Sequence, residues 1–211
     1  MRGALAQRAE IAEESEGARV IPLPDRALLE RHVRGDPSAF AALVEAWQGP
    51  VYGYLARSGV AGAERDDLFQ DVFLRIHRGL AEGLPPGPTG PWIFAIAVNA
   101  VRSHFRKARV RAVVTLSEDP AATAAHDAPS PERALALRQT TAWALEEIAK
   151  LPLEQREALL LCTVHGLELR DAADALGVPA ETVKTRLRRA RIALAEARAR
   201  RSLREEREGV R

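Results

Sequence analysis

The chain has 211 residues, of which 46% are hydrophobic and 28% charged, and its formal net charge is +2. This length and hydrophobic content allow one large or two small packed domains and exclude a disordered chain. The single cysteine, Cys162, excludes an internal disulfide and a multi-cysteine zinc site. Because Cys162 lies in an apolar run, we expect a buried structural thiol, with a reactive thiol as the alternative.

The distribution of apolar residues gives the fold class and the compartment. The N-terminal residues carry glutamates where a secretory signal needs an apolar core, and no run of about 18 apolar residues is present to span a bilayer. We therefore expect a cytoplasmic protein with no membrane insertion. Strand signals are nearly absent, and Ala, Leu, Arg and Glu dominate between Gly and Pro turns, which predicts an all-α fold.

The chain is predicted to form two small helical domains joined by a flexible linker. Residues 1–24 are expected to be a flexible N-terminal tail, and residues 25–111 the first domain. The linker is expected over 112–131, which is rich in Pro, Ala and acidic residues. The second domain is expected over 132–200, with a charged C-terminal tail over 201–211.

Turn residues divide the first domain. Its first two helices are expected to break near Gly35, where Asp36 can cap the next helix and Pro37 can occupy the first helical position. Further on, residues 83–91 (GLPPGPTGP) predict a stiff loop that leads into a helix opening at Trp92.

The segment 67–79 (DLFQDVFLRIHRG) predicts a helix with two usable faces. One face is an apolar stripe suited to the core. The other is acidic with an apolar edge, which fits either a solubilising surface or a docking surface for a basic partner protein. The second face consists of Asp67, Gln70, Asp71 and Leu74.

The helix expected after Trp92 also has two faces. Phe94, Val98, Val101 and Phe105 are expected to face the core. The opposite side offers the stacking and hydrogen-bonding groups that unpaired bases need, although core packing is the alternative for Trp92. That side consists of Trp92, Ile96, Asn99, Ser103 and Arg106. Nearby cations are expected to bind phosphates, and they are Arg102, Arg106, Lys107, Arg109 and Arg111.

Residues 167–191 (LELRDAADALGVPAETVKTRLRRAR) predict a helix-turn-helix with its turn at Gly177 and Pro179. Gly177 suits a positive φ at the end of the first helix, and Pro179 suits the start of the second. In the second helix Val183, Leu187 and successive apolar residues form the buried stripe. The residues expected to contact DNA from its other faces are Glu181, Thr182, Lys184, Thr185, Arg188 and Arg189.

Charge along this second helix favours DNA contact over a solvated surface. Between residues 184 and 201 eight side chains are basic and only Glu196 is acidic. A solvated helix more often alternates the two signs. The basic residues are Lys184, Arg186, Arg188, Arg189, Arg191, Arg198, Arg200 and Arg201.

The order of these segments resembles the extracytoplasmic-function sigma factors of bacterial RNA polymerase. The resemblance covers residues 25–200 and is carried by DLFQDVFLRIHRG, PWIFAIAVNAVRSHFRK and LPLEQREALLLCTVHGLELRDAADALGVPAETVKTRLRRAR. It implies a sigma region 2 domain, a linker and a sigma region 4 domain. The implied partners are core RNA polymerase, through its β′ clamp helices and β flap, promoter DNA in double- and single-stranded form, and an anti-sigma factor.

The resemblance also assigns residues. Asp67, Gln70, Asp71 and Leu74 match the helix that binds the β′ clamp helices. Asn99 matches a position that holds an unpaired base of the −10 element, and the loop 83–91 stands where such a base is captured. Matches to recognition-helix positions at the −35 element are Lys184, Thr185 and Arg189.

Two other classes of function fit the sequence less well. A stand-alone helix-turn-helix regulator that binds operator DNA as a dimer normally carries a domain with βα alternation, and none is visible here. An enzyme would need a catalytic or metal-ligand motif, and the sequence has no HExxH, P-loop or GxSxG pattern. We therefore expect no catalytic residues, no metal site and no cofactor.

Overall fold

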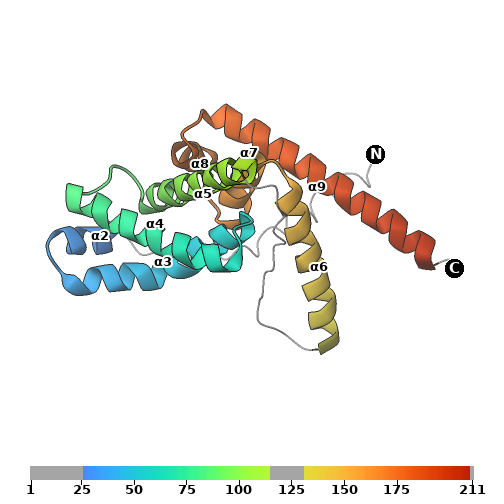
Figure 1. The fold of residues 1–211 in the computed structure, drawn as a ribbon, viewed down its shortest axis with the longest axis horizontal. Helices are drawn as coiled ribbons and strands as arrows, with labels where there is room; N and C mark the ends of the chain where they lie inside the picture. The colour runs from blue at the N-terminus through green and yellow to red at the C-terminus, as the bar shows by residue number, and fades with distance from the viewer. Residues whose placement is uncertain (1–25, 115–130, 210–211) are drawn as a thin grey trace, which may run out of the picture.

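The computed structural model describes residues 26–114 and 131–209, and within these ranges every regular element is a helix, so the predicted all-α class is confirmed (Figure 1). The expected tail 1–24 and most of the expected linker lie outside the described residues. The elements are α2 (Arg26–Val33), α3 (Pro37–Arg57), α4 (Gly62–Glu82), α5 (Thr89–Val114), α6 (Pro131–Lys150), α7 (Leu153–Leu159), the π-helical turn η2 (Leu160–Val164), α8 (Leu169–Leu176) and α9 (Ala180–Gly209).

The predicted break between the first two helices is present between α2 and α3. Asp36 caps α3 by accepting hydrogen bonds from Ser38 N (2.9 Å) and Ser38 Oγ (2.7 Å), and Pro37 follows as the first helical residue. The hydrogen bonds from Ser38 and from the Arg31 guanidinium lower the pKa of Asp36 to about 2. This N-cap forms from residues close in sequence, which is why local patterns predicted it.

The helix expected to open at Trp92 begins three residues earlier, at Thr89. The sequence predicts Pro91 as the last residue of the loop. In the structure Pro91 lies in the first turn of α5. Backbone N–H groups in the first turn of a helix have no intrahelical acceptor, so a proline, which has no N–H, loses no hydrogen bond there. The loop between α4 and α5 is therefore shorter than expected and comprises residues 83–88.

The core of the first half lies between α3, α4 and α5. Trp47 and Tyr54 of α3 are fully buried and both meet the ring of Phe94 edge-on, at centroid distances of 5.7 and 5.8 Å. Ile76 of α4 and Ile93 of α5 complete this layer. Edge-to-face rings of this kind add about 0.5–1.5 kcal/mol beyond their area burial. The result is a rigid support for the exposed faces of α4 and α5.

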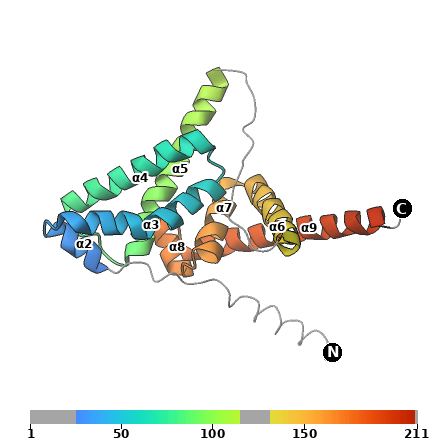
Figure 2. The same cartoon turned by 90° about the horizontal axis from the view of Figure 1, so that it is seen from below.

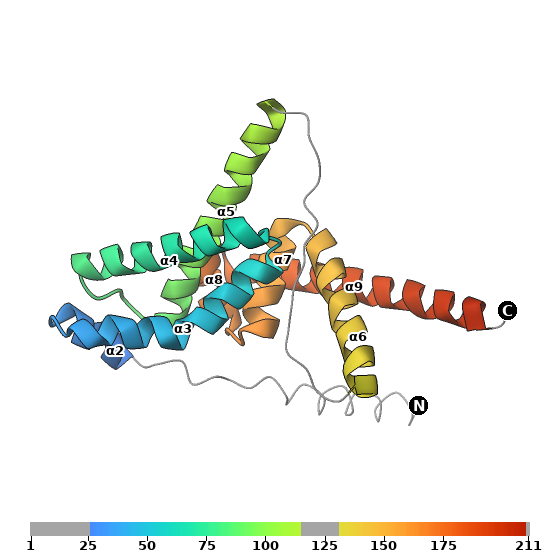
Figure 3. The same ribbon diagram turned by 60° about the horizontal axis from the view of Figure 1, so that its bottom comes forward.

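The two halves of the chain pack on each other and share one continuous core. Figures 1 and 2 both show α7 and α8 seated against the α3–α5 layer, and α8 lies alongside α5. The C-terminal end of α5 projects away from this body, as Figure 3 shows most clearly. The packed halves bring residues far apart in sequence into contact.

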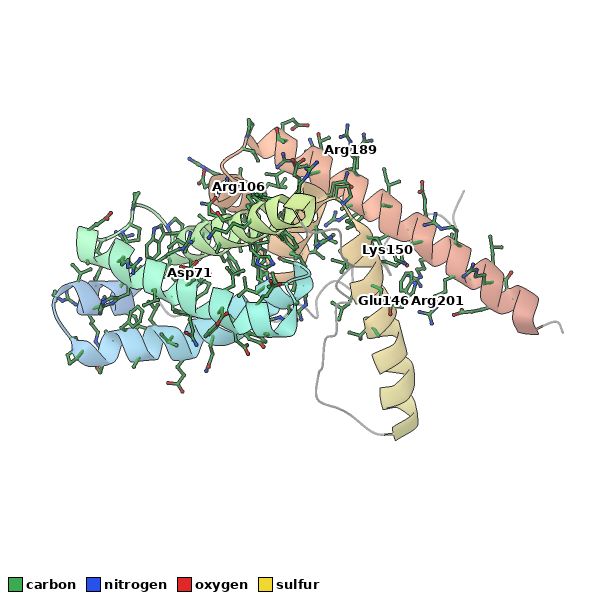
Figure 4. All side chains as sticks on the ribbon, in the orientation of Figure 1. Asp71, Arg106, Glu146, Lys150, Arg189 and Arg201 are labelled. Atoms are coloured by element: carbon green, nitrogen blue, oxygen red, sulfur yellow. The ribbon has the colours of Figure 1, made fainter. Side chains whose placement is uncertain are left out.

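The long helix α9 runs beyond the packed body and is braced by α6. The guanidinium of Arg201 lies 5.3 Å from the ring centroid of Trp143 in α6 and pairs with Glu205 at 2.7 Å, and Arg201 extends toward α6 in Figure 4. Residues 201–209 were expected to be a charged tail, and in the structure they continue α9 as a helix.

Candidate functional site

The helix-turn-helix forms as the sequence predicts. Gly177 ends α8 in the left-handed region at φ 66°, and its N–H reaches back to Ala173 and Asp174. The carbonyl of Pro179 then accepts from Thr182 N (2.9 Å) and Val183 N (3.2 Å), which starts α9. Val183 and the other residues of the predicted stripe face inward: Val183, Leu187 and Ala190 are buried, and Leu194 is partly buried.

The remaining faces of α9 carry the predicted DNA-contacting side chains, four of which are exposed. Glu181, Lys184, Arg188 and Arg189 are exposed, whereas Thr182 and Thr185 are partly buried. Lys184 Nζ lies 3.6 Å from Glu181, so this pair stays loose and solvated. Side chains of α7 and α9 line an open groove beside this surface: Glu154, Gln155, Glu181, Thr182, Thr185, Arg186 and Arg189.

The outer side of α5 carries a second polar surface. Asn99 and Arg106 are exposed, and Arg106 Nη2 donates to Ser103 Oγ at 3.3 Å. Trp92 is half-buried and packs on α4, where a Cβ at Gly79 would lie 3.0 Å from its Cζ2. Both predicted roles of Trp92, core packing and base stacking, therefore stay open, because the ring packs on α4 but is only half-buried. Figure 4 places Arg106 near the projecting end of α5.

Arg102 does not belong to this surface, which corrects the prediction that it binds phosphate. Its guanidinium donates to both carboxylate oxygens of Glu157 in α7, at 2.9 and 2.7 Å, and to the carbonyl of Leu176 at 3.1 Å. The Glu157 side chain is 0% exposed and that of Arg102 33% exposed. Burial raises the pKa of Glu157, opposed by the hydrogen bonds from Arg102. The pair is an internal tie between the two halves.

Arg156, next to Glu157, makes a second tie. Its guanidinium donates to the carbonyl of Ser58 at the end of α3 (2.5 Å), to that of Ile148 in the last turn of α6 (3.0 Å) and to that of Leu151 just after α6 (3.0 Å). Gly59 has φ +87°, and a Cβ there would lie 2.9 Å from Arg156 Nη1. Glycine is therefore required both by the backbone angle and by the approach of the guanidinium.

His165 fills an apolar site between the halves. Its ring lies 4.5 Å from that of Phe94 and 6.0 Å from that of Tyr54. Its Nε2 is buried without a hydrogen-bond partner among the residues that the structure describes. Burial, aided by the charge of Arg57, lowers the pKa of His165 to about 4. The imidazole is therefore neutral near pH 7 and acts as an apolar ring.

The predicted acidic face of α4 is exposed as a unit. Asp67 and Gln70 point to solvent, Leu74 is 53% exposed, and Asp71 pairs with Arg75 at 2.7 Å. Figure 4 shows Asp71 on α4, well apart from Arg189 on α9. An open groove of about 810 Å³ adjoins this face, lined by Gln48, Gly49, Tyr52, Asp66, Phe69 and Gln70.

The sequence reading missed the residues that join the halves, because their partners lie far along the chain. Arg102 and Glu157 are 55 positions apart, and no local pattern links them. Cys162 is half-buried, and burial raises the pKa of its thiol, which agrees with a structural role. Across the described ranges no group of His, Cys, Asp and Glu could hold a metal ion, and no helix there is long and apolar enough to cross a bilayer.

Two family models match the chain, in the order of the two halves. Residues 43–111 match sigma-70 region 2, and residues 141–194 match sigma-70 region 4. The first match contains the acidic face of α4 and the polar surface of α5. The second contains the helix-turn-helix.

Curated relatives cover most of the chain. The RNA polymerase sigma factor NccH of Alcaligenes xylosoxydans xylosoxydans is 34% identical over 175 residues, which are 82% of this chain and 94% of that protein. The sigma factor CnrH of Cupriavidus metallidurans is 32% identical over 176 residues, 81% of this chain and 92% of that one. The sigma-H factor of Pseudomonas aeruginosa is 32% identical over 179 residues, 82% and 93% of the two chains.

Solved structures share the fold. CnrH in complex with the cytosolic domain of CnrY superimposes with a TM-score of 0.62 at 24% identity and covers 82% of this chain and 96% of that chain. RpoE of Bartonella quintana in complex with the anti-sigma factor NepR gives 0.63 at 23% identity, over 74% and 94% of the two chains.

Proposed function

Because the chain belongs to the sigma-70 family, as an extracytoplasmic-function sigma factor that directs promoter-specific transcription by RNA polymerase, we propose a division of that task between its surfaces. Residues 25–111 form the region 2 domain, which binds core polymerase and the −10 element. Residues 132–200 form the region 4 domain, which binds the −35 element. Such a protein acts by binding alone, and polymerase performs the catalysis.

The acidic face of α4 is proposed to bind the β′ clamp helices of core polymerase. Asp67 and Asp71 supply negative charge, and Leu74 supplies an exposed apolar edge on the same side of the helix. Gln70 joins this face to the adjoining groove. Complementary charge increases the rate of association, and buried apolar contacts then hold the complex. The β flap is the proposed partner of the region 4 domain.

The outer side of α5 is proposed to bind the opened strand at the −10 element. Asn99 offers an exposed amide to the edge of an unpaired base, and Arg106, held beside Ser103, offers charge to its phosphate. The exposed part of Trp92 gives an aromatic surface on the same helix. Opening is favoured because these groups bind the unpaired strand and not the duplex.

The exposed face of α9 is proposed to read the −35 element in the major groove. Lys184, Arg188 and Arg189 reach phosphates and guanine edges, while the hydroxyls of Thr182 and Thr185 serve bases or backbone. Glu181 stands at the N-terminal end of this helix. Lys184, Thr185 and Arg189 also match family positions for the −35 element, whereas Glu181, Thr182 and Arg188 are assigned from the helix alone.

The observation that carries the proposal is the pair of family matches in order, each over an exposed binding surface. The test is transcription by the purified chain with core polymerase on a promoter library. We expect transcripts from promoters that share −10 and −35 elements. Tight operator binding by the free chain, with no transcripts, would favour a stand-alone regulator instead. A cytoplasmic location and an anti-sigma partner are part of the same proposal.

Arg189→Ala tests the assignment on α9. Loss of a base contact should weaken −35 binding by about 1–3 kcal/mol and relax the preference at one position. Arg200→Ala is the matched control, because Arg200 is an exposed cation on the same helix about 16 Å farther along. An unchanged promoter preference in Arg189→Ala would remove Arg189 from the reading surface.

A further inference from the structure

The loop that joins α4 to α5, residues 83–88, is held from outside by one arginine. Arg26 Nη1 donates to the carbonyl of Pro85 at 3.1 Å and to the carbonyl of Gly87 at 2.7 Å. These two carbonyls lie two residues apart, on either side of the bend of the loop. A single nitrogen that bonds both of them fixes the curvature of the loop between them.

Arg26 is aimed at the loop by its own helix. It is the first residue of α2, and that helix is anchored in the core by Leu29, which is fully buried. Glu30, one turn on, lies 3.6 Å from Arg26 Nε. The ion pair with Glu30 has both side chains exposed and adds little, so the two bonds to the loop carbonyls are the main interactions of the Arg26 guanidinium.

The loop 83–88 bends at two glycines and exposes apolar side chains. Gly83 has φ +132° and Gly87 φ +78°, so the chain turns sharply at both. Pro85 is buried, whereas Leu84, Pro86 and Pro88 expose apolar edges on which the face of an unpaired base can pack. The position of these edges relative to Asn99 depends on the bend that Arg26 fixes.

We propose that Arg26 is a positioning residue for the −10 element: it holds loop 83–88 where the loop meets the unpaired base, and so sets how strongly that base is preferred. The inference rests on the proposed function. Arg26 lies outside residues 43–111, the span that matches sigma-70 region 2. The donor therefore comes from the N-terminal helix, outside the matched region, while its two acceptors, Pro85 and Gly87, lie inside that region.

The test uses the full chain with core polymerase on promoters in which each −10 position is replaced in turn. Permanganate reactivity of unpaired thymines measures the open complex. Arg26→Ala should lose about tenfold of the preference at one position, with −35 preference and core binding unchanged. Arg26→Lys keeps a hydrogen-bond donor at this position and should retain part of that −10 preference. Arg34→Ala is the control, because Arg34 is an exposed cation at the other end of the same helical segment.

The outcomes separate a positioning role from a structural one. If Arg26→Ala lowers thermal stability but keeps the wild-type preference at every −10 position, the proposal is wrong. Should Arg26→Ala fail to fold, Arg26→Met, which keeps the aliphatic stem but has no donor, decides by the same criterion, with Arg34→Ala as its reference. If the wild-type chain opens no promoter at all, the proposed function fails first, and the inference fails with it.

Discussion

The bond between Arg102 and Glu157 gives the sharpest test of how the two halves are joined. Arg102→Met removes the guanidinium and leaves the Glu157 carboxylate, which is 0% exposed, without its main partner. Breaking a buried pair in this way costs about 3–5 kcal/mol. Because Arg102 is itself 33% exposed, water can reach part of the vacated space, so we expect the lower end, about 3 kcal/mol.

Thermal unfolding followed by far-ultraviolet circular dichroism measures this loss. For a chain of this size 1 kcal/mol shifts Tm by about 2–4 °C, so Arg102→Met should lower Tm by about 6–12 °C. Replacing both partners, with Arg102→Met and Glu157→Leu together, should recover most of the loss, because no unpaired charge remains. The surface pair Arg75–Asp71 is the matched control: it has the same 2.7 Å distance, but both side chains are 40% exposed. Arg75→Met should cost about 0.5 kcal/mol or less.

The loss should also depend on pH in a definite direction. Burial raises the pKa of Glu157 above its ordinary 4.5, so the folded chain holds this proton more tightly than the unfolded chain. Arg102→Met removes the hydrogen bonds that lower this pKa, so the pKa of Glu157 is higher still in the variant. The added penalty is therefore absent at low pH, where Glu157 is protonated in both folded proteins, and grows as the pH rises through the wild-type pKa. The Tm gap between wild type and Arg102→Met should be largest near pH 7 and shrink toward pH 4. If Arg102→Met lowers the free energy of unfolding by less than about 1 kcal/mol, with no change with pH, then Arg102 and Glu157 do not form a buried ion pair between the halves.

Two further predictions concern the same contact region. The pKa of His165 is lowered to about 4 in the folded chain, so the unfolded chain takes up a proton first as the pH falls. Stability should drop by about 3 kcal/mol between pH 6.5 and 4, and His165→Leu should remove that part of the drop in Tm-versus-pH curves; parallel curves would contradict it. Gly59→Ala should destabilise by about 1 kcal/mol or more in urea unfolding, because of its φ of +87° and the nearby Arg156. Gly62→Ala, with open space around it, should be neutral or stabilising, and equal effects at both glycines would refute the reasoning.

Local patterns predicted the parts of this molecule that local physics determines. The turn at Gly177 and the cap at Asp36 depend on neighbouring residues, and both formed as expected. The acidic face of α4 followed from helical spacing alone. The start of α5 was placed too late, because a proline reads as a loop residue although the first turn of a helix tolerates it.

The role of Arg102 could not be predicted in this way. In the sequence it is one of five cations at the end of α5, and nothing nearby separates it from Arg106. Its carboxylate partner, Glu157, is on the other half of the chain. Only the packing of the halves shows that Arg102 is paired with a carboxylate whereas Arg106 is exposed. Arg26 was missed for the same reason, because its acceptors are about 60 residues away.

The continuous core has a consequence for measurements of affinity. Any complex that needs the halves apart must draw on a minor population in which α8 has left α5, and the free energy of exposing that interface is subtracted from the binding free energy. Apolar area costs about 25 cal/mol per Å² to expose, so even a modest interface lowers the apparent affinity severalfold. A region 4 half expressed alone would carry no such cost, and its affinity for a −35 duplex would overstate that of the intact chain.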